Sequence, residues 1–136
     1  MKEFMVEAST SNLDNIINFM IKELEKYNCK MSSLLQLQVA VEELFVNICN
    51  YAYVPNVGKV KMQIDIVKVP LTAVIKLIDN GKKYNPLEKS DPDITKSAEE
   101  REIGGLGILL AKKNVDVIKY EYSDGKNIVT LKKKMI

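Results

Sequence analysis

The sequence contains no histidine, and only two of its 136 residues are cysteine. The absence of histidine excludes Ser-His-Asp catalysis, a phosphohistidine carried by this chain, and zinc bound through histidine. Cys29 and Cys49 have no spacing that pairs them, so we expect two reduced thiols, as in the cytoplasm. Cys49 falls within a helical apolar pattern and is expected to be a small residue of the core.

Long hydrophobic runs and an excess of one charge are also absent. The net charge is +2, which is too small to predict a nucleic-acid partner or an anionic membrane. No segment approaches the roughly 20 apolar residues that a membrane span needs. The N-terminal segment carries an acid at Glu3 and has no signal-peptide pattern. We therefore expect a cytoplasmic protein.

The composition is that of an ordinary soluble domain, with 46% hydrophobic and 28% charged residues. A chain of this length can bury a core without a disulfide or a structural metal. No internal repeat or linker is visible, so residues 1–136 are predicted to form a single domain.

Alternating patterns predict strands, and apolar residues three and four apart predict helices. The first half is predicted to contain a strand over Lys2–Ala8, an N-cap among Ser9–Asn12, a helix with apolar residues from Leu13 to Leu24, a break at Asn28–Lys30, and a second helix capped by Ser32 or Ser33 that ends near Tyr53–Pro55. The second half is predicted to contain a strand over Lys59–Val69, its hairpin partner over Leu71–Asp79, a polar lid over Asn85–Ile103, a helix opened by Gly104–Gly107, and two strands joined by Asp124-Gly125.

This order of elements predicts an α/β (α+β) two-layer sandwich. We expect a mixed, mainly antiparallel sheet covered on one face by helices.

Glu43 and Asn47 lie one turn apart on the second helix, away from its main apolar set. Gln36 and Ala40 are expected on the same side. An Asn carbonyl oxygen suits Mg²⁺, and a carboxylate one turn earlier can hold a metal-bound water or accept a hydroxyl proton. An ordinary solvated helix face would have the same pattern.

Two further motifs have a chemical and a structural interpretation. Asp79 ends a strand two residues before Gly81, so it could accept a hydrogen bond from an exocyclic amine, or simply form a turn. Gly104, Gly105 and Gly107 open a helix, where free amides bind phosphate, or they form a flexible connection. The glycines fit neither the Walker A motif nor the Rossmann fingerprint.

The three motifs together resemble the N, G1 and G2 boxes of the GHKL ATP-binding superfamily, which has the Bergerat fold. The segments VAVEELFVNICNYAY, DNGKKYNP and GGLGILLAKKNVDVIKYEY are most similar to the stand-alone anti-sigma-factor serine kinases of bacterial partner-switching systems. The resemblance covers essentially the whole chain.

The resemblance implies ATP and Mg²⁺ as cofactors and a role for each motif. Asn47 would bind the Mg²⁺ that bridges the phosphates, and Glu43 would be the catalytic carboxylate. Asp79 would accept the adenine amino group, with Gly81 beside the ring. The three glycines would hold phosphates, and Thr130 would support the water network at the adenine.

The resemblance also implies partners. These are an anti-sigma-factor antagonist protein, phosphorylated on serine, a competing sigma factor, and a second copy of the chain in a homodimer. Two positions depart from the family, because Tyr51 replaces a common His and Ile103 replaces an Arg before the glycines. Arg101 could substitute for that Arg. Loss of the Arg would reduce phosphate transfer more than nucleotide binding, so a protein-binding switch without kinase activity is the alternative function. A detached histidine-kinase domain is disfavoured by the short lid.

Overall fold

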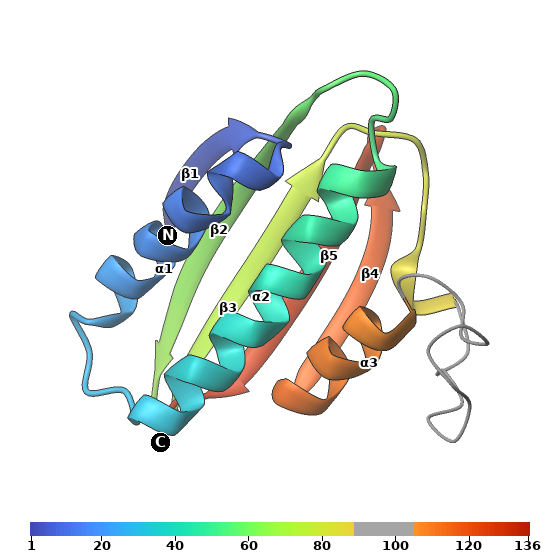
Figure 1. The fold of residues 1–136 in the computed structure, drawn as a ribbon. Helices are drawn as coiled ribbons and strands as arrows, with labels where there is room; N and C mark the ends of the chain where they lie inside the picture. Colours follow the sequence, from blue (N-terminus) through green and yellow to red (C-terminus); the bar gives the residue numbers. More distant parts are fainter. Residues whose placement is uncertain (89–104) are drawn as a thin grey trace.

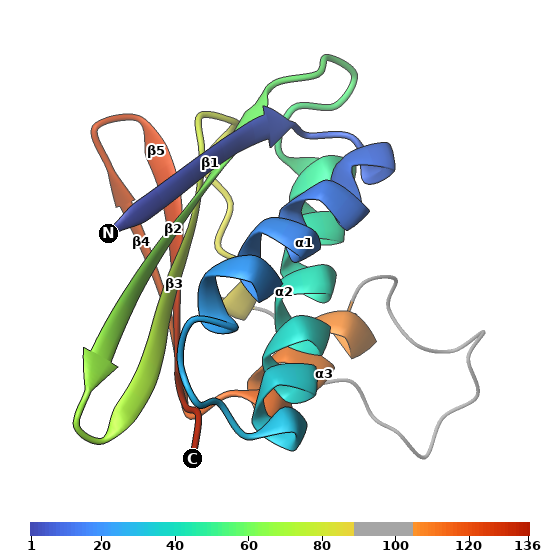
Figure 2. The same ribbon diagram turned by 90° about the vertical axis from the view of Figure 1, so that its left-hand side faces the viewer.

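The computed structural model describes residues 1–88 and 105–136. In these residues five strands form one sheet, and three α-helices pack on one of its faces (Figure 1). The strands are β1 (Lys2–Glu7), β2 (Lys59–Lys68), β3 (Leu71–Asp79), β4 (Val117–Ser123) and β5 (Lys126–Lys134), and the helices are α1 (Leu13–Leu24), α2 (Met31–Tyr51) and α3 (Gly105–Asn114). Figure 2 shows the sheet edge-on with all three helices on one side. The predicted two-layer sandwich is confirmed.

The strands follow the order β1-β2-β3-β5-β4, and all four pairings are antiparallel. The mixed sheet that the sequence predicts is therefore antiparallel throughout its described strands. The β4–β5 turn is formed by Asp124 and Gly125, whose φ angles are 52° and 75°. Positive φ at both central residues is what a tight two-residue hairpin requires, so this predicted turn is confirmed.

The core lies between the helices and the inward face of the sheet. Alternation along β3 directs Ala73, Ile75 and Leu77 toward the helices, where all three are buried. α2 crosses the middle of the sheet between α1 and α3 (Figure 1). Its buried apolar side chains are Leu37, Ala40, Val41, Leu44, Phe45 and Ile48.

Two details of α2 differ from the prediction. The helix begins at Met31 with Lys30 as its N-cap, and no side chain caps it. The predicted cap at Ser32 or Ser33 is therefore wrong, and Ser33 is buried in the first turn. Ala40 was expected beside the polar residues of α2 but is fully buried, because α3 packs against α2.

Other predictions near the helices stand. Ser9 caps a short 3₁₀ helix, η1 (Thr10–Asn12), that leads into α1, and its hydroxyl accepts a hydrogen bond from the Ser11 amide.

Cys29 and Cys49 are free thiols, and burial raises the pKa of Cys49 to about 11.

The predicted lid over Asn85–Ile103 lies outside the described residues, except for its first four. There, Pro86–Glu88 forms a second 3₁₀ helix, η2. Among the described helices, none is long and apolar enough to span a membrane.

The packing of α2 can be tested with two leucines of the same helix. Leu37 is fully buried, whereas Leu35 is 53% exposed. We expect Leu37→Ala to lower the free energy of unfolding by about 2–5 kcal/mol, because it removes buried methyl groups and leaves a cavity. Leu35→Ala should change it by less than about 0.5 kcal/mol. Urea denaturation measures both, and equal losses would show that α2 does not pack as described.

Candidate functional site

One side of α2 presents Glu43, Asn47 and Tyr51, each four residues from the next. Residues at this spacing stand above one another along a helix. All three are half-buried. In the described part of the chain, neither the Glu43 carboxylate nor the Asn47 side-chain amide forms a hydrogen bond, whereas Tyr51 has interaction partners. Half-buried polar groups without protein partners are available to a ligand.

Two hollows meet along this side of α2. The inner hollow lies between α2, the end of β3 and the start of β5, and its lining includes Asp79, Tyr84 and Asn127. The outer hollow lies between α2 and α3, has a volume of about 200 Å³, and is lined by Glu43 and Gly107 among others. Asn47 and Tyr51 line both hollows. The structure thus joins the separate sequence motifs into one depression.

Asp79 is the polar centre of the inner hollow. It is the last residue of β3, on the inward side, and is only 5% exposed. Its Oδ1 accepts hydrogen bonds from the Gly81 amide and from Asn127 Nδ2, each 2.9 Å long. Burial raises the pKa of Asp79, and the two hydrogen bonds oppose that rise. Because both bonds go to Oδ1, Oδ2 is the oxygen left for a ligand.

Asn127, which the sequence analysis missed, fixes the position of Asp79. Its Nδ2 also donates to the Lys82 carbonyl at 2.9 Å, and its Oδ1 accepts from the Tyr84 amide and the Tyr120 hydroxyl. These bonds use the full capacity of the amide. A signal was present in the sequence, because Asn127 alternates in step with the apolar residues Val129 and Leu131 and so points to the same side of the strand. A polar residue on the apolar side of a strand indicates a specific hydrogen-bonding function.

The end of α2 is tied to the end of β3 beside this hollow. A β-carbon on Gly81 would lie 2.3 Å from the Ala52 carbonyl oxygen, so only glycine fits there. The Tyr53 hydroxyl donates to the Lys59 carbonyl at 2.6 Å and accepts from the Asn80 amide at 2.7 Å. These contacts hold Asp79 in a fixed place relative to α2.

Two aromatic rings form part of the inner wall. The rings of Tyr51 and Tyr84 have centroids 6.0 Å apart and planes tilted by 32°. Both line the inner hollow. Flat rings beside a buried acceptor suit a planar base that carries an amine.

The outer hollow brings Glu43 against the first turn of α3. A β-carbon on Gly107 would lie 2.5 Å from Glu43 Oε2, so the carboxylate packs directly on this glycine. The first amides of a helix lack partners within the helix and attract negative groups. Gly105 is the first residue of α3. Gly104, Arg101 and Ile103 lie outside the described residues.

Thr130 is not brought to the site. Along β5, alternation directs Asn127 and Val129 toward the helices and Thr130 toward the opposite face. There, Thr130 lines a separate hollow with Lys76 and Lys119. The prediction that it supports the adenine is therefore corrected, and Asn127 takes the place beside Asp79.

The donors of the outer hollow fit Mg²⁺ bound together with phosphates. Within the described residues, no group of three His, Cys, Asp or Glu side chains could hold a metal ion by itself. Mg²⁺ usually takes one or two protein oxygens and completes its shell with water and phosphate oxygens. Asn47 Oδ1 could supply such an oxygen, and the Glu43 carboxylate could hold a water bound to the metal.

Comparison with known proteins decides the family. Residues 6–133 match the family described as the histidine kinase-like ATPase domain. The chain belongs to this family. Membership implies ATP binding, which agrees with the joined hollows.

Individual relatives are more distant. A serine/threonine-protein kinase, BtrW of Bordetella bronchiseptica, is 24% identical over 95 residues, which are 70% of this chain and 66% of that protein, just under two thirds of its length. The RsbU and RsbW domains of Rv1364c from Mycobacterium tuberculosis superpose with a TM-score of 0.68 at 13% identity, covering 99% of this chain and 33% of that one. The histidine kinase domain of the Erythrobacter litoralis EL346 blue-light activated histidine kinase gives a TM-score of 0.59 at 12% identity, covering 93% and 60%. The superposition on these two structures shows that this chain shares their fold.

Asn47 provides the first test of the site. We expect Asn47→Ala to weaken the binding of ATP in the presence of Mg²⁺ by at least about tenfold, because it removes the amide oxygen that both hollows share. The variant should retain its fold, since the Asn47 side chain forms no hydrogen bond with any described residue. Isothermal titration calorimetry measures the affinity. Gln36→Ala, an exposed position on the same helix, is the control, and unchanged affinity in Asn47→Ala would contradict the assignment.

Asp79 provides a test through pH. Because burial raises its pKa in the folded protein, the folded state holds this proton more tightly than the unfolded chain does. The stability that this proton provides is therefore lost as the pH rises through the raised pKa. Asp79→Asn can keep both hydrogen bonds to Oδ1 without a charge. We expect its stability, relative to the unmodified protein, to increase in urea denaturation as the pH rises from about 4, the ordinary pKa of an Asp side chain, through the raised pKa. Asp79→Asn should also bind ATP more weakly. A stability difference that does not change with pH would contradict the raised pKa of Asp79.

Proposed function

We propose that the chain binds Mg-ATP in the joined hollows and transfers the γ-phosphoryl group to a serine of an anti-sigma-factor antagonist protein. The observation that carries this proposal is that Asn47 and Tyr51 line both hollows. A nucleotide lying along them would have its base at the buried acceptor and its phosphates at the start of α3. Family membership and the kinase name of one relative support the same function.

The inner hollow holds the groups that would recognise adenine, and its volume of about 20 Å³, enough for a water molecule, would have to increase for the base to enter. Asp79 Oδ2 would accept a hydrogen bond from the exocyclic amine, while Asn127 and the Gly81 amide hold Oδ1 in place. The rings of Tyr51 and Tyr84 would lie against the faces or edge of the base. Since Asp79 only accepts when it is ionised, an amine is favoured over a carbonyl at this position.

The outer hollow suits the phosphates and the transfer step. Bound Mg²⁺ would neutralise charge on the phosphates, and Asn47 would hold it. Gly107, together with Gly104 and Gly105, would offer backbone amides to the phosphate oxygens. The serine Oγ forms a bond to the γ-phosphorus as the bond to the bridging oxygen of ADP breaks, and Glu43 accepts the serine proton.

A protein-binding switch without phosphate transfer is the second candidate. The observation that favours it is Ile103, which stands where similar kinases have an arginine. Such a switch would use the same nucleotide site to control the capture of a sigma factor, and a homodimer would serve either function. The two candidates differ only in whether phosphate moves to the partner.

Glu43 separates these candidates. It has a matched neighbour in Glu42, whose carboxylate accepts a hydrogen bond from Gln38 at 2.9 Å and lines neither hollow. The experiment incubates the protein with γ-labelled ATP, Mg²⁺ and a candidate antagonist. We expect label on a serine of the antagonist, and a loss of roughly 10²–10⁴-fold in rate for Glu43→Gln but not for Glu42→Gln.

ATP binding should survive in both variants, which separates catalysis from affinity. A stable ATP-dependent complex without label on the antagonist would favour the switch. If Glu43→Gln transferred phosphate at the normal rate, the assigned role of Glu43 would be wrong.

A further inference from the structure

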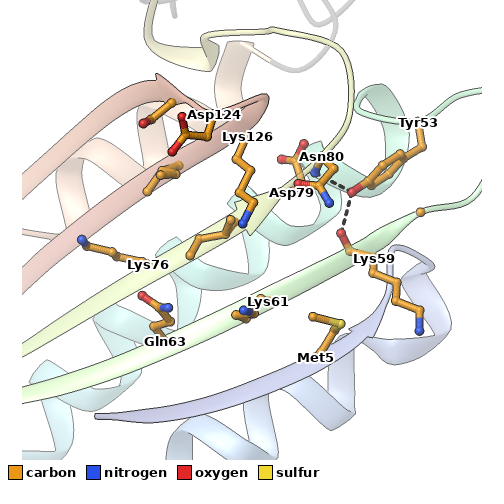
Figure 3. Close-up of a pocket in the computed structure, with 14 residues that line it drawn as sticks. Met5, Tyr53, Lys59, Lys61, Gln63, Lys76, Asp79, Asn80, Asp124 and Lys126 are labelled. Atoms are coloured by element: carbon orange, nitrogen blue, oxygen red, sulfur yellow. Dashed lines mark hydrogen bonds between the residues drawn. The ribbon is translucent and has the colours of Figure 1, made fainter.

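The sheet has a second face, which no described helix covers (Figure 2). Strand alternation sends every second residue of β1, β2, β3, β4 and β5 to this side. A hollow of about 550 Å³, larger than either hollow of the nucleotide site, lies on it. We refer to this hollow as the basic groove, because four lysines, Lys59, Lys61, Lys76 and Lys126, line it. In Figure 3 these lysines come from β2, β3 and β5 and surround the groove.

The strand register gives the groove an apolar floor between its charges. Met5, Lys61, Ile78 and Ile128 form one row across β1, β2, β3 and β5. The next row along the strands runs through Gln63, Lys76 and Thr130. Met5 is 51% exposed, and Ile78 and Ile128 are half-buried although none of the described elements lies over them. Apolar side chains on an uncovered sheet face indicate a contact surface.

The positive charge of the groove is largely uncompensated. In the described residues, Lys61 is paired with Glu3 at 3.8 Å, and no ion pair is found for Lys59, Lys76 or Lys126. Two acids line the groove. Asp79 accepts its hydrogen bonds on the helix-covered side of the sheet, and Asp124 lies at the edge of the groove in the β4–β5 turn. The groove is therefore locally basic in a chain whose net charge is only +2.

A second hollow of mixed charge adjoins the basic groove. It has a volume of about 400 Å³, shares Lys76, and adds Lys119 and Lys132 together with the acids Asp65 and Glu121. A run of lysines spread across several strands exceeds the reach of one small anion. It matches a polypeptide segment, whose side chains could place carboxylates at the lysines and apolar groups on Met5, Ile78 and Ile128.

We propose that the uncovered face of the sheet binds an acidic segment of a partner protein that also carries apolar side chains. Carboxylates of the segment pair with Lys59, Lys76 and Lys126, and its apolar residues cover the floor. The surface is separate from the nucleotide hollows, so this proposal does not depend on phosphate transfer.

A nucleic acid fits the face less well. Glu3, Asp65 and Glu121 also point to this side of the sheet, so acids interrupt its lysines. A peptide can place separate carboxylates at the lysines alone, whereas a continuous phosphate backbone would also meet these acids. The groove offers one aromatic ring, Tyr53, and its hydroxyl is engaged with two backbone groups. Single-stranded nucleic acids need several rings for stacking.

The test uses a fluorescein-labelled peptide of about 12 residues, long enough to cross the sheet, with Glu at alternate positions and Leu or Ser between them. The matched peptide has Gln in place of every Glu. The protein is compared with Lys59→Glu/Lys76→Glu/Lys126→Glu and with Lys22→Glu/Lys30→Glu/Lys113→Glu. The second triple variant changes the net charge equally at exposed positions away from the groove.

We expect the Glu peptide to bind the unmodified protein, with an affinity that falls as salt is added. The groove variant should weaken binding by at least about tenfold, and the control variant should weaken it much less. Fluorescence anisotropy measures this, and ATP titration with melting curves confirms that both variants fold and retain the nucleotide site.

Four results would overturn the proposal. They are no binding of the Glu peptide, equal binding of the Gln peptide, equal losses in both triple variants, and tighter binding of a labelled thymidine oligonucleotide than of the peptide. A self-associated protein that becomes monomeric only in the groove variant, seen by sedimentation, would instead assign the face to a second copy of the chain.

Discussion

The proposed nucleotide site depends on one buried carboxylate. Asp79 is kept at the inner end of the depression by hydrogen bonds from Asn127 and from the Gly81 amide, and these bonds determine which of its oxygens can meet a ligand. Burial opposes ionisation, while the two donors favour it. Burying a carboxylate at this position lowers stability, which the proposed recognition of an exocyclic amine would explain.

The helix α2 serves the core and the site at once. Its apolar side packs on the sheet, and its other side carries Glu43 and Asn47 along the two hollows. Tyr53 and Gly81 then lock the end of this helix to the end of β3. In the proposed nucleotide site, the distance between the base and the phosphates would therefore be set by the rigid length of this helix.

Much of this arrangement was predictable from sequence, because it depends on local patterns. Alternation identified the strands, helical spacing placed Glu43 and Asn47 together, and Asp124-Gly125 identified its turn. The failures concern contacts between distant segments. Asn127 acquires its importance only when β5 pairs beside β3. Thr130 faces away from the helices because side chains alternate along β5. Ala40 is buried because α3 packs against α2, which no pattern within α2 reveals.

The contact between Glu43 and Gly107 has a consequence for how the site works. The carboxylate already rests on the first turn of α3, where negative groups are attracted. An incoming phosphate would therefore compete with a charge that belongs to the protein. The Glu43 side chain would have to move aside when the nucleotide binds and could return when the product leaves. The group proposed to accept the proton would therefore also occupy the phosphate position in the absence of nucleotide.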